Sequence, residues 1–183
     1  RELLSSNHNY GNPAIKVSKK QVLLYDVGGK QFSLYNSFNK TREEKLDYAV
    51  YGADMAQKSG DFAIITKSEK YDSVVTVYKQ NGKVYNYGFS KGYVCGVSLS
   101  DKGKQMAVLL AYANGSEIKT ELRLYTVGKD DYKSADIGFS GVPYEVNILD
   151  GATLTTTELN YVDGVTSNIQ TQLNGKSSTS HTH

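Results

Sequence analysis

The feature that most constrains the fold is a short motif that recurs along the chain. An apolar run ends in a tyrosine and is followed five residues later by a lysine, at Tyr35 to Lys40 and Tyr78 to Lys83, with a looser copy at Tyr125. The three tyrosines are separated by 43 and 47 residues. A repeat of this length is typical of chains made of stacked supersecondary units, each covering an apolar face of its neighbour. We therefore expect a modular array of similar units.

Aligning the chain on itself divides its 183 residues into four units within one domain, at about 14–48, 49–91, 92–142 and 143–183. Each complete unit is expected to hold four strands, with a glycine-type turn between the first and the second. Asn81-Gly82 is a strong hairpin signal between the third and fourth strands, because glycine accepts a positive φ. The expected strands are 22–25, 32–35, 44–48, 53–57, 62–65, 74–78, 84–89, 96–100, 106–109, 122–125, 132–139, 145–149, 154–159 and 165–173.

These patterns predict an all-β fold. No stretch keeps a helical period for more than about one turn, and the 15 tyrosines suit a half-buried pleated surface. Four-stranded antiparallel units at a period of ~40–50 residues are typical of propeller blades. We expect a β-propeller-like array of about four such blades. A β-sandwich of the same strands remains the alternative, since regular short strands alone do not separate the two folds.

Composition excludes some partners and leaves others open. The net charge of +2 makes no case for a nucleic-acid or membrane surface partner. No segment approaches the ~18 apolar residues of a membrane span. The chain begins at Arg1 rather than at methionine, so we expect it to be a piece of a longer protein. A membrane anchor would then lie in a segment absent from this chain.

Catalytic, metal and cofactor motifs are not recognisable in the sequence. There is no P-loop, no G-x-S-x-G elbow, no H-E-x-x-H and no EF-hand loop. His181 and His183 would share one strand face, but no third ligand is suggested, so a polar tail is favoured over a metal site. We predict no catalytic residue, no metal site and no cofactor.

Cys95 is the single cysteine, on a strand that begins a repeat unit. As a nucleophile it would need a neighbouring histidine, and the three histidines all lie near the termini. A buried structural thiol is the favoured interpretation, because free cysteine behaves as a small hydrophobic residue. The repeated tyrosines Tyr35, Tyr78 and Tyr125 are interpreted in the same way, as packing residues rather than as an aromatic ligand platform.

A binding face is predicted from the loops that vary between units. The loop after the second strand differs in length from copy to copy, and in propellers it shares a face with the connections between blades. Binding residues tend to lie on such loops above a rigid scaffold. The alternative is a set of solvated connectors that carry ordinary tyrosines. The candidate ligand-binding residues are Tyr71, Asp72, Lys91, Tyr93, Tyr112 and Asn114.

Three segments resemble an uncharacterised bacterial family of WD40-like propeller proteins. They are residues 22–36, 73–78 and 97–104, and the likeness covers roughly 13–141. The resemblance implies a domain that follows one transmembrane helix and faces outside the cell. It implies no activity that could be assigned to residues here. Family members are usually longer than 183 residues, so the four units are expected to form an arc rather than a closed ring.

Three functions are therefore compared. The first is a non-catalytic extracellular module that binds a protein or cell-wall ligand through one loop face. The second is a glycan hydrolase or lyase whose carboxylates converge on the propeller axis, as two-carboxylate hydrolysis requires. The third is a structural role, in which an open arc pairs its edge strands with another copy. The sequence favours the first.

Overall fold

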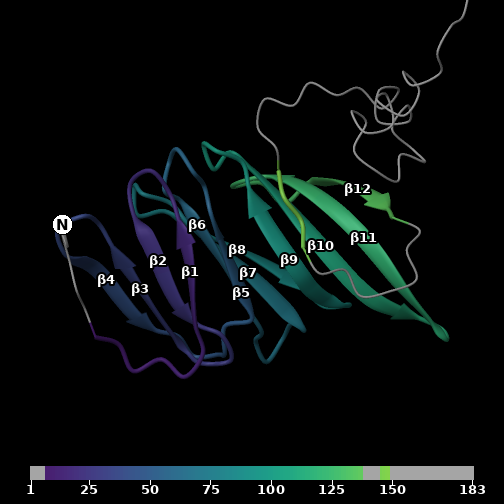
Figure 1. Ribbon diagram of the computed structural model, residues 1–183. Helices are drawn as coiled ribbons and strands as arrows, with labels where there is room; N and C mark the ends of the chain where they lie inside the picture. The colour runs from purple at the N-terminus through teal and green to yellow at the C-terminus, as the bar shows by residue number, and fades with distance from the viewer. Residues whose placement is uncertain (1–6, 138–144, 149–183) are drawn as a thin grey trace, which may run out of the picture. The chain divides into compact units, whose positions relative to one another are not determined.

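A computed structural model describes residues 7–137 and 145–148 of the chain (Figure 1). All of them lie within the first of two compact units, residues 1–150. Most of the predicted fourth repeat unit, including the strands expected at 154–159 and 165–173 and the pair His181 and His183, falls outside the described residues.

The described part of the chain contains three four-stranded antiparallel sheets, each with its strands hydrogen-bonded in chain order. The first holds β1 (Pro13–Val17), β2 (Val22–Asp26), β3 (Gln31–Tyr35) and β4 (Lys40–Lys45). The second holds β5 (Gly52–Met55), β6 (Phe62–Thr66), β7 (Ser73–Tyr78) and β8 (Val84–Phe89). The third holds β9 (Tyr93–Leu99), β10 (Gln105–Asn114), β11 (Glu117–Thr126) and β12 (Tyr132–Asp136).

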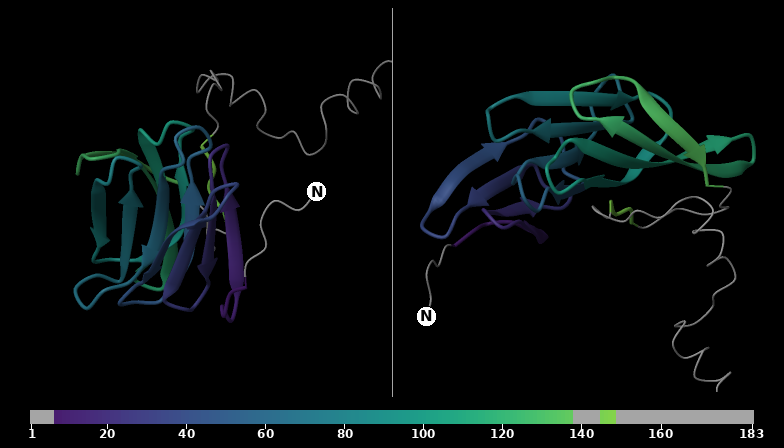
Figure 2. Two further views of the ribbon diagram at one scale, coloured as in Figure 1. Left: turned by 90° about the vertical axis from the view of Figure 1, so that its left-hand side faces the viewer. Right: turned by 90° about the horizontal axis from the view of Figure 1, so that it is seen from above.

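The sheets follow one another along the chain and are arranged like propeller blades (Figures 1 and 2). Their first strands, β1, β5 and β9, lie beside one another, so the sheets extend outward from a common inner side. In a β-sandwich the same strands would be divided between two facing sheets. The propeller-like arrangement predicted from the repeat is therefore the one observed.

Several expected strands differ from the structure in their bounds, and β1 was not expected. The strand expected at 44–48 begins at Lys40 and ends at Lys45. It starts early because a turn, closed by a 3.0 Å hydrogen bond from Asn36 N to Asn39 O, brings Lys40 opposite Tyr35. Leu46, within the expected strand, instead lies in the connection to β5, against the core. Residues 145–148, at the start of the expected strand 145–149, are not in a strand.

One core lies between the first and second sheets. Phe32 and Phe62 are almost fully buried, and Tyr78 stacks on Phe62 with ring centroids 4.7 Å apart and an interplanar angle of 11°. The Arg42 guanidinium lies 4.9 Å from the centre of the Tyr78 ring. A stacked ring with a cation above it is favoured by the negative face of the aromatic system. Tyr78 is therefore a packing residue of the joint between two sheets.

A second core lies between the second and third sheets. Val77 and Val108 are fully buried there, and the ring of Tyr125 lies 5.1 Å from that of Tyr87. Tyr125 thus repeats the role of Tyr78 one blade later, which confirms the packing interpretation for both.

Tyr35 occupies the equivalent position in the first sheet but is only half-buried. No described sheet precedes the first, so no blade covers the face on which Tyr35 lies. Part of that face is covered by Tyr10, whose hydroxyl lies 2.7 Å from Ser33 Oγ. The same repeat position therefore has two environments, set by whether a neighbouring blade is present.

The inner strands are joined by contacts that repeat at equivalent positions. Lys16, Asp54 and Ser98 occupy the same register position in β1, β5 and β9. Lys16 Nζ lies 3.8 Å from Asp54 Oδ1. Leu99 N donates to Asp54 Oδ2 at 2.8 Å, and Ile148 N donates to Ser98 Oγ at 2.9 Å. Each inner strand therefore contacts the following segment through one side chain.

Asp54 gives a test of this arrangement. Burial raises the pKa of its carboxyl, and the hydrogen bond from Leu99 N and the nearby Lys16 act in the opposite direction. When folding raises the pKa of a carboxyl, that carboxyl contributes fully to the free energy of unfolding at pH values below its unfolded pKa. The contribution is lost as the pH rises through the folded pKa. We expect the Asp54→Asn variant to gain stability relative to the wild type as the pH rises from about 4 to 7.

Denaturant unfolding at a series of pH values measures this difference. An amide oxygen can still accept the hydrogen bond from Leu99 N, so the comparison isolates the charge. A stability difference between the two proteins that does not change with pH would contradict the prediction.

A second set of contacts joins the turns between the first two strands of successive sheets. Lys19 N donates to Gln57 O at 3.0 Å, and one unit later Ser59 N donates to Asp101 O at 3.0 Å. These paired residues occupy equivalent positions in the repeat. Since the turns lie at the edge opposite the long loops, each blade is tied to the next at both its inner strand and its turn.

Asp61 is the buried charge of this turn edge, with only 3% of its surface exposed. Its Oδ2 lies 2.5 Å from Lys79 Nζ and accepts a hydrogen bond from Ser59 Oγ at 2.9 Å. Gln80 N donates to Oδ1 at 2.9 Å. Lys79 Nζ in turn donates to Gly103 O, in the third sheet, at 2.8 Å. The Asp61–Lys79 pair therefore joins the second sheet to the turn of the third.

Candidate functional site

Five connections lie at one edge of the sheets, which we call the loop edge. They are the β2–β3 turn (27–30), the β4–β5 connection (46–51), the β6–β7 loop (67–72), the β8–β9 connection (90–92) and the tip of the β10–β11 hairpin (115–116). They meet at one edge because the sheets are antiparallel and their first strands run the same way (Figure 1). The predicted binding residues were assigned to this edge.

A cavity of about 510 Å³ opens at the loop edge between the second and third sheets, and we call it the tyrosine cavity. Three tyrosines from three separate segments line it: Tyr51, Tyr71 and Tyr93. Lys67 and Asp72, both exposed, supply one positive and one negative group at its wall. Its other lining residues are Ser68, Ser73 and Val94.

Tyr71 is held in place by its own loop. Its N–H donates to Ser68 Oγ at 3.0 Å, and its carbonyl accepts a hydrogen bond from Ser68 N at 3.1 Å. The ring lies directly against Gly88 of β8, where an added Cβ would be 2.6 Å from the nearest ring carbon. Glycine at this position therefore allows the ring to lie flat on the strand, and Tyr71 forms a fixed wall of the cavity.

The backbones of Tyr51 and Tyr93 are fixed by hydrogen bonds, and their aromatic rings are exposed. Tyr51 N donates to Ile65 O at 2.8 Å, and Tyr93 pairs with Ala111 across the β9–β10 ladder. Their side chains stay exposed, at 52% for Tyr51 and 68% for Tyr93. Leaving a large aromatic side chain exposed to water is unfavourable. Two such exposed side chains beside one cavity therefore indicate a surface that another molecule could cover.

The segment that follows Tyr93 is anchored from beneath. Val94 N donates to the buried Ser73 Oγ at 3.0 Å, which joins the start of β9 to the start of β7. Because this contact is buried, it fixes the position of Tyr93 relative to the β6–β7 loop. The two sides of the tyrosine cavity are therefore set by the blade joint itself.

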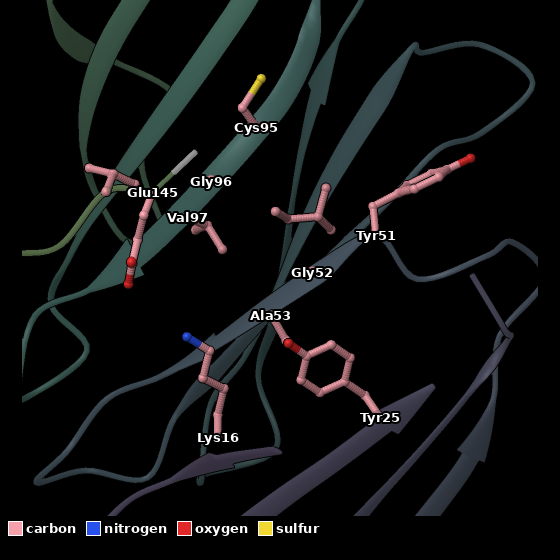
Figure 3. A pocket seen from close by; sticks show the side chains of 11 residues that line it. Lys16, Tyr25, Tyr51, Gly52, Ala53, Cys95, Gly96, Val97 and Glu145 are labelled. Carbon is pink, nitrogen blue, oxygen red and sulfur yellow. The ribbon is translucent and has the colours of Figure 1, made fainter. Parts of the chain in front are cut away.

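A second cavity, also of about 510 Å³, lies against the inner strands, and we call it the axial cavity. Lys16 and Tyr25 approach it from the first sheet, while Cys95, Gly96 and Val97 line it from β9 (Figure 3). Glu145 also lines it. Tyr51 lines both cavities, and the neighbouring residues Val94 and Cys95 line one each. The two cavities are thus adjacent along β9.

Residues 1–157 match a family described as a family of unknown function, DUF5711. The chain belongs to this family. No curated protein matches the sequence. Membership agrees with the resemblance to an uncharacterised propeller family but assigns no activity.

Among solved structures, this DUF5711 member is similar to the crystal structure of the Myceliophteria thermophila Cps50 (Swd1) beta-propeller domain. The TM-score is 0.53 at 15% sequence identity, and the match covers 79% of this chain. It covers 47% of the other chain, so the chain spans about half the length of that propeller domain. The likeness confirms the propeller fold.

The six predicted binding residues are divided by the structure. Tyr71, Asp72 and Tyr93 line the tyrosine cavity together. Lys91 is exposed in the β8–β9 connection but does not line the cavity. The other two, Tyr112 and Asn114, need a correction.

Tyr112 and Asn114 were expected in a loop and instead lie in β10. The β10–β11 ladder continues to the pair Asn114 and Glu117, beyond the end of both outer strands of the sheet. Tyr112 is packed against Gly92, whose added Cβ would lie 2.8 Å from Tyr112 Cβ. Sequence reasoning also missed Tyr51 and Lys67. Both lie in connections at the loop edge, a position that could have signalled them.

Cys95 lies at a β-bulge. β9 pairs with β10 through Gly96 and Val94, which leaves Cys95 as the extra residue between them. A bulge redirects a side chain, and the thiol is half-buried at the axial cavity rather than enclosed in a core. Burial raises the pKa of the Cys95 thiol, which lowers the share of reactive thiolate. The expectation of a fully buried thiol is therefore wrong, although a raised pKa does not favour a nucleophile.

The axial cavity is where an enzyme of this fold would bring its carboxylates together. Among the described residues that line it, Glu145 is the one acid. Asp54, whose pKa is raised, is engaged with Leu99 N and is not among the lining residues. Two acids facing one substrate position are thus not found in the described part of the cavity.

Within residues 7–137 and 145–148, no group of three His, Cys, Asp or Glu side chains could hold a metal ion. No helix in the same residues has the length and apolar character needed to cross a membrane. Of the two cavities, the tyrosine cavity is the candidate site that the geometry supports best, because tyrosines from three separate segments line it.

Proposed function

We propose that the chain is a non-catalytic binding module that captures its ligand at the loop edge of a propeller-type scaffold. The observation that carries this proposal is the convergence of Tyr51, Tyr71 and Tyr93 from three separate segments around one cavity. Two of these rings are largely exposed. Rigid strands that carry exposed aromatic residues on their connections are a common basis for binding.

The cellular context is part of the same proposal. The resemblance to propeller proteins that follow a transmembrane helix supports a place on the outer side of a bacterial cytoplasmic membrane. A protein or a cell-wall component would then be within reach of the loop edge. The tyrosines suit either class of ligand, because an aromatic ring supplies a large contact area with few rotatable bonds.

Replacement of Tyr93 with alanine is expected to weaken ligand binding at least about tenfold, since the most exposed ring at the cavity is removed. Asp72→Ala should weaken binding less, because an exposed carboxylate adds little affinity. Binding is measured by biolayer interferometry on a fixed panel of purified cell-wall glycan, cell-wall peptides and random-sequence peptides.

Phe38→Ala is the matched control, because Phe38 is 85% exposed and lies in the β3–β4 turn at the opposite edge. This variant should bind as the wild type does. If no probe on the panel binds, or if Tyr93→Ala and Phe38→Ala bind equally well, the loop edge is not the ligand site.

A further inference from the structure

We propose that the ligand of the loop edge is a glycan chain of pyranose sugars that runs from the tyrosine cavity, past Tyr51, into the axial cavity. This inference rests on the proposed binding function and names its ligand class. The two cavities share Tyr51, and Val94 and Cys95, adjacent in β9, line one cavity each. Each is about 510 Å³, within the range of ~300–1,000 Å³ usual for small-ligand sites. A ligand made of repeated rigid units fits two such adjoining spaces.

The exposed aromatic rings suit the face of a sugar ring. The face of a tyrosine ring is negative, so it attracts the slightly positive C–H bonds on one side of a pyranose. Tyr51 is 52% exposed and Tyr93 is 68% exposed. A large part of each ring is therefore accessible for such stacking.

The rest of the lining favours a sugar over an apolar peptide side chain. Peptide anchors usually fill well-packed, desolvated apolar pockets. In the tyrosine cavity, Val94 is the single aliphatic residue among those that the structure describes as lining it. Beyond the tyrosine rings, an apolar anchor would therefore find one aliphatic side chain, whereas a polyhydroxylated ligand could also use the charged and hydroxyl groups of the wall.

The polar groups along the path match hydroxyl chemistry. A hydroxyl both donates and accepts hydrogen bonds. Lys67 can donate and Asp72 can accept in the tyrosine cavity, and both side chains are exposed. In the axial cavity Lys16 can donate and Glu145 can accept. Donors and acceptors thus occur in both spaces, as a chain with hydroxyls on every unit would require.

The test uses isothermal titration with two soluble series, β-1,4-linked N-acetylglucosamine and α-1,4-linked glucose, each from the monosaccharide to the hexasaccharide. In at least one series, affinity is expected to rise with chain length until both cavities are filled and then to level off. Tyr93→Ala should weaken binding of every length, by about tenfold for one lost stacking contact. Tyr51→Ala should remove most of the gain from added length. Phe38→Ala and circular dichroism of each variant control for folding.

The outcomes separate this inference from the proposed function. If peptides bind at the loop edge in a Tyr93-dependent manner and no saccharide binds, the glycan inference is overturned and the binding module stands. If saccharides bind with an affinity that does not depend on length, the path through both cavities is overturned. If neither peptides nor saccharides bind, both proposals fail together.

Discussion

Replacement of Asp61 with alanine is expected to lower the free energy of unfolding by about 3–5 kcal/mol, the usual loss when one partner of a buried ion pair is removed. Asp61 is 3% exposed, and Lys79 would lose its counter-charge while only 20% of its own side chain is exposed. Ser59 Oγ and Gln80 N would also lose their acceptor. A loss of this size is a large part of the ~5–15 kcal/mol that usually holds a domain folded.

A double-mutant cycle measures the pair directly by denaturant unfolding. Lys79→Met should also destabilise the chain, but the Asp61→Ala, Lys79→Met double variant should lose less than the sum of the two single losses, because no unpaired charge is left buried. Glu43→Gln is the control, since the Lys40–Glu43 pair is exposed and such pairs contribute only about 0–1 kcal/mol. Additive losses would show that Asp61 and Lys79 do not act as a pair.

The second large effect is expected at Tyr78. Tyr78→Ala should cost about 3–5 kcal/mol, the range for large aromatic side chains removed from a core. The ring stacks on Phe62, lies 5.6 Å from Phe32 and carries the Arg42 guanidinium above it. Its removal would leave a cavity at the joint of the first two sheets and an uncovered cation beside it.

Tyr35 supplies the matched control, because it occupies the equivalent position in the repeat. Tyr35→Ala should cost only about 1 kcal/mol, since no described blade covers the half-buried ring. Unfolding of both variants is followed by far-ultraviolet circular dichroism. This signal comes mainly from the backbone, so the loss of one tyrosine side chain changes it little. Equal losses for Tyr35 and Tyr78 would mean that the preceding blade is not what stabilises the ring.

Much of the fold could be predicted because the signals are local. Strand alternation, the Asn81-Gly82 turn and the spacing of the tyrosines each depend on residues close together in the chain. The strand expected at 84–89 has the bounds of β8. The strand expected at 44–48 was misplaced because Leu46, an apolar residue in a connection, resembles a strand residue in sequence.

The candidate site was predictable only in part. Its edge followed from the topology of a four-stranded repeat, and Tyr71, Asp72 and Tyr93 do share a cavity there. Tyr112 was misassigned because hydrogen bonding between β10 and β11 extends the hairpin beyond its counterparts in the other sheets. Tyr51 was missed because its part in the cavity depends on where one connection lies relative to the next blade.

The repeated pattern of residues was sufficient to establish the architecture, since a blade forms from hairpins whose turns and alternation are written within a few dozen residues. It could not distinguish Tyr35 from Tyr78, or a buried thiol from Cys95 at its bulge. Those differences arise when one blade packs against the next, because burial, ion pairing and cavity shape depend on residues far apart in the chain. The Asp61–Lys79 pair and the tyrosine cavity are both products of that packing.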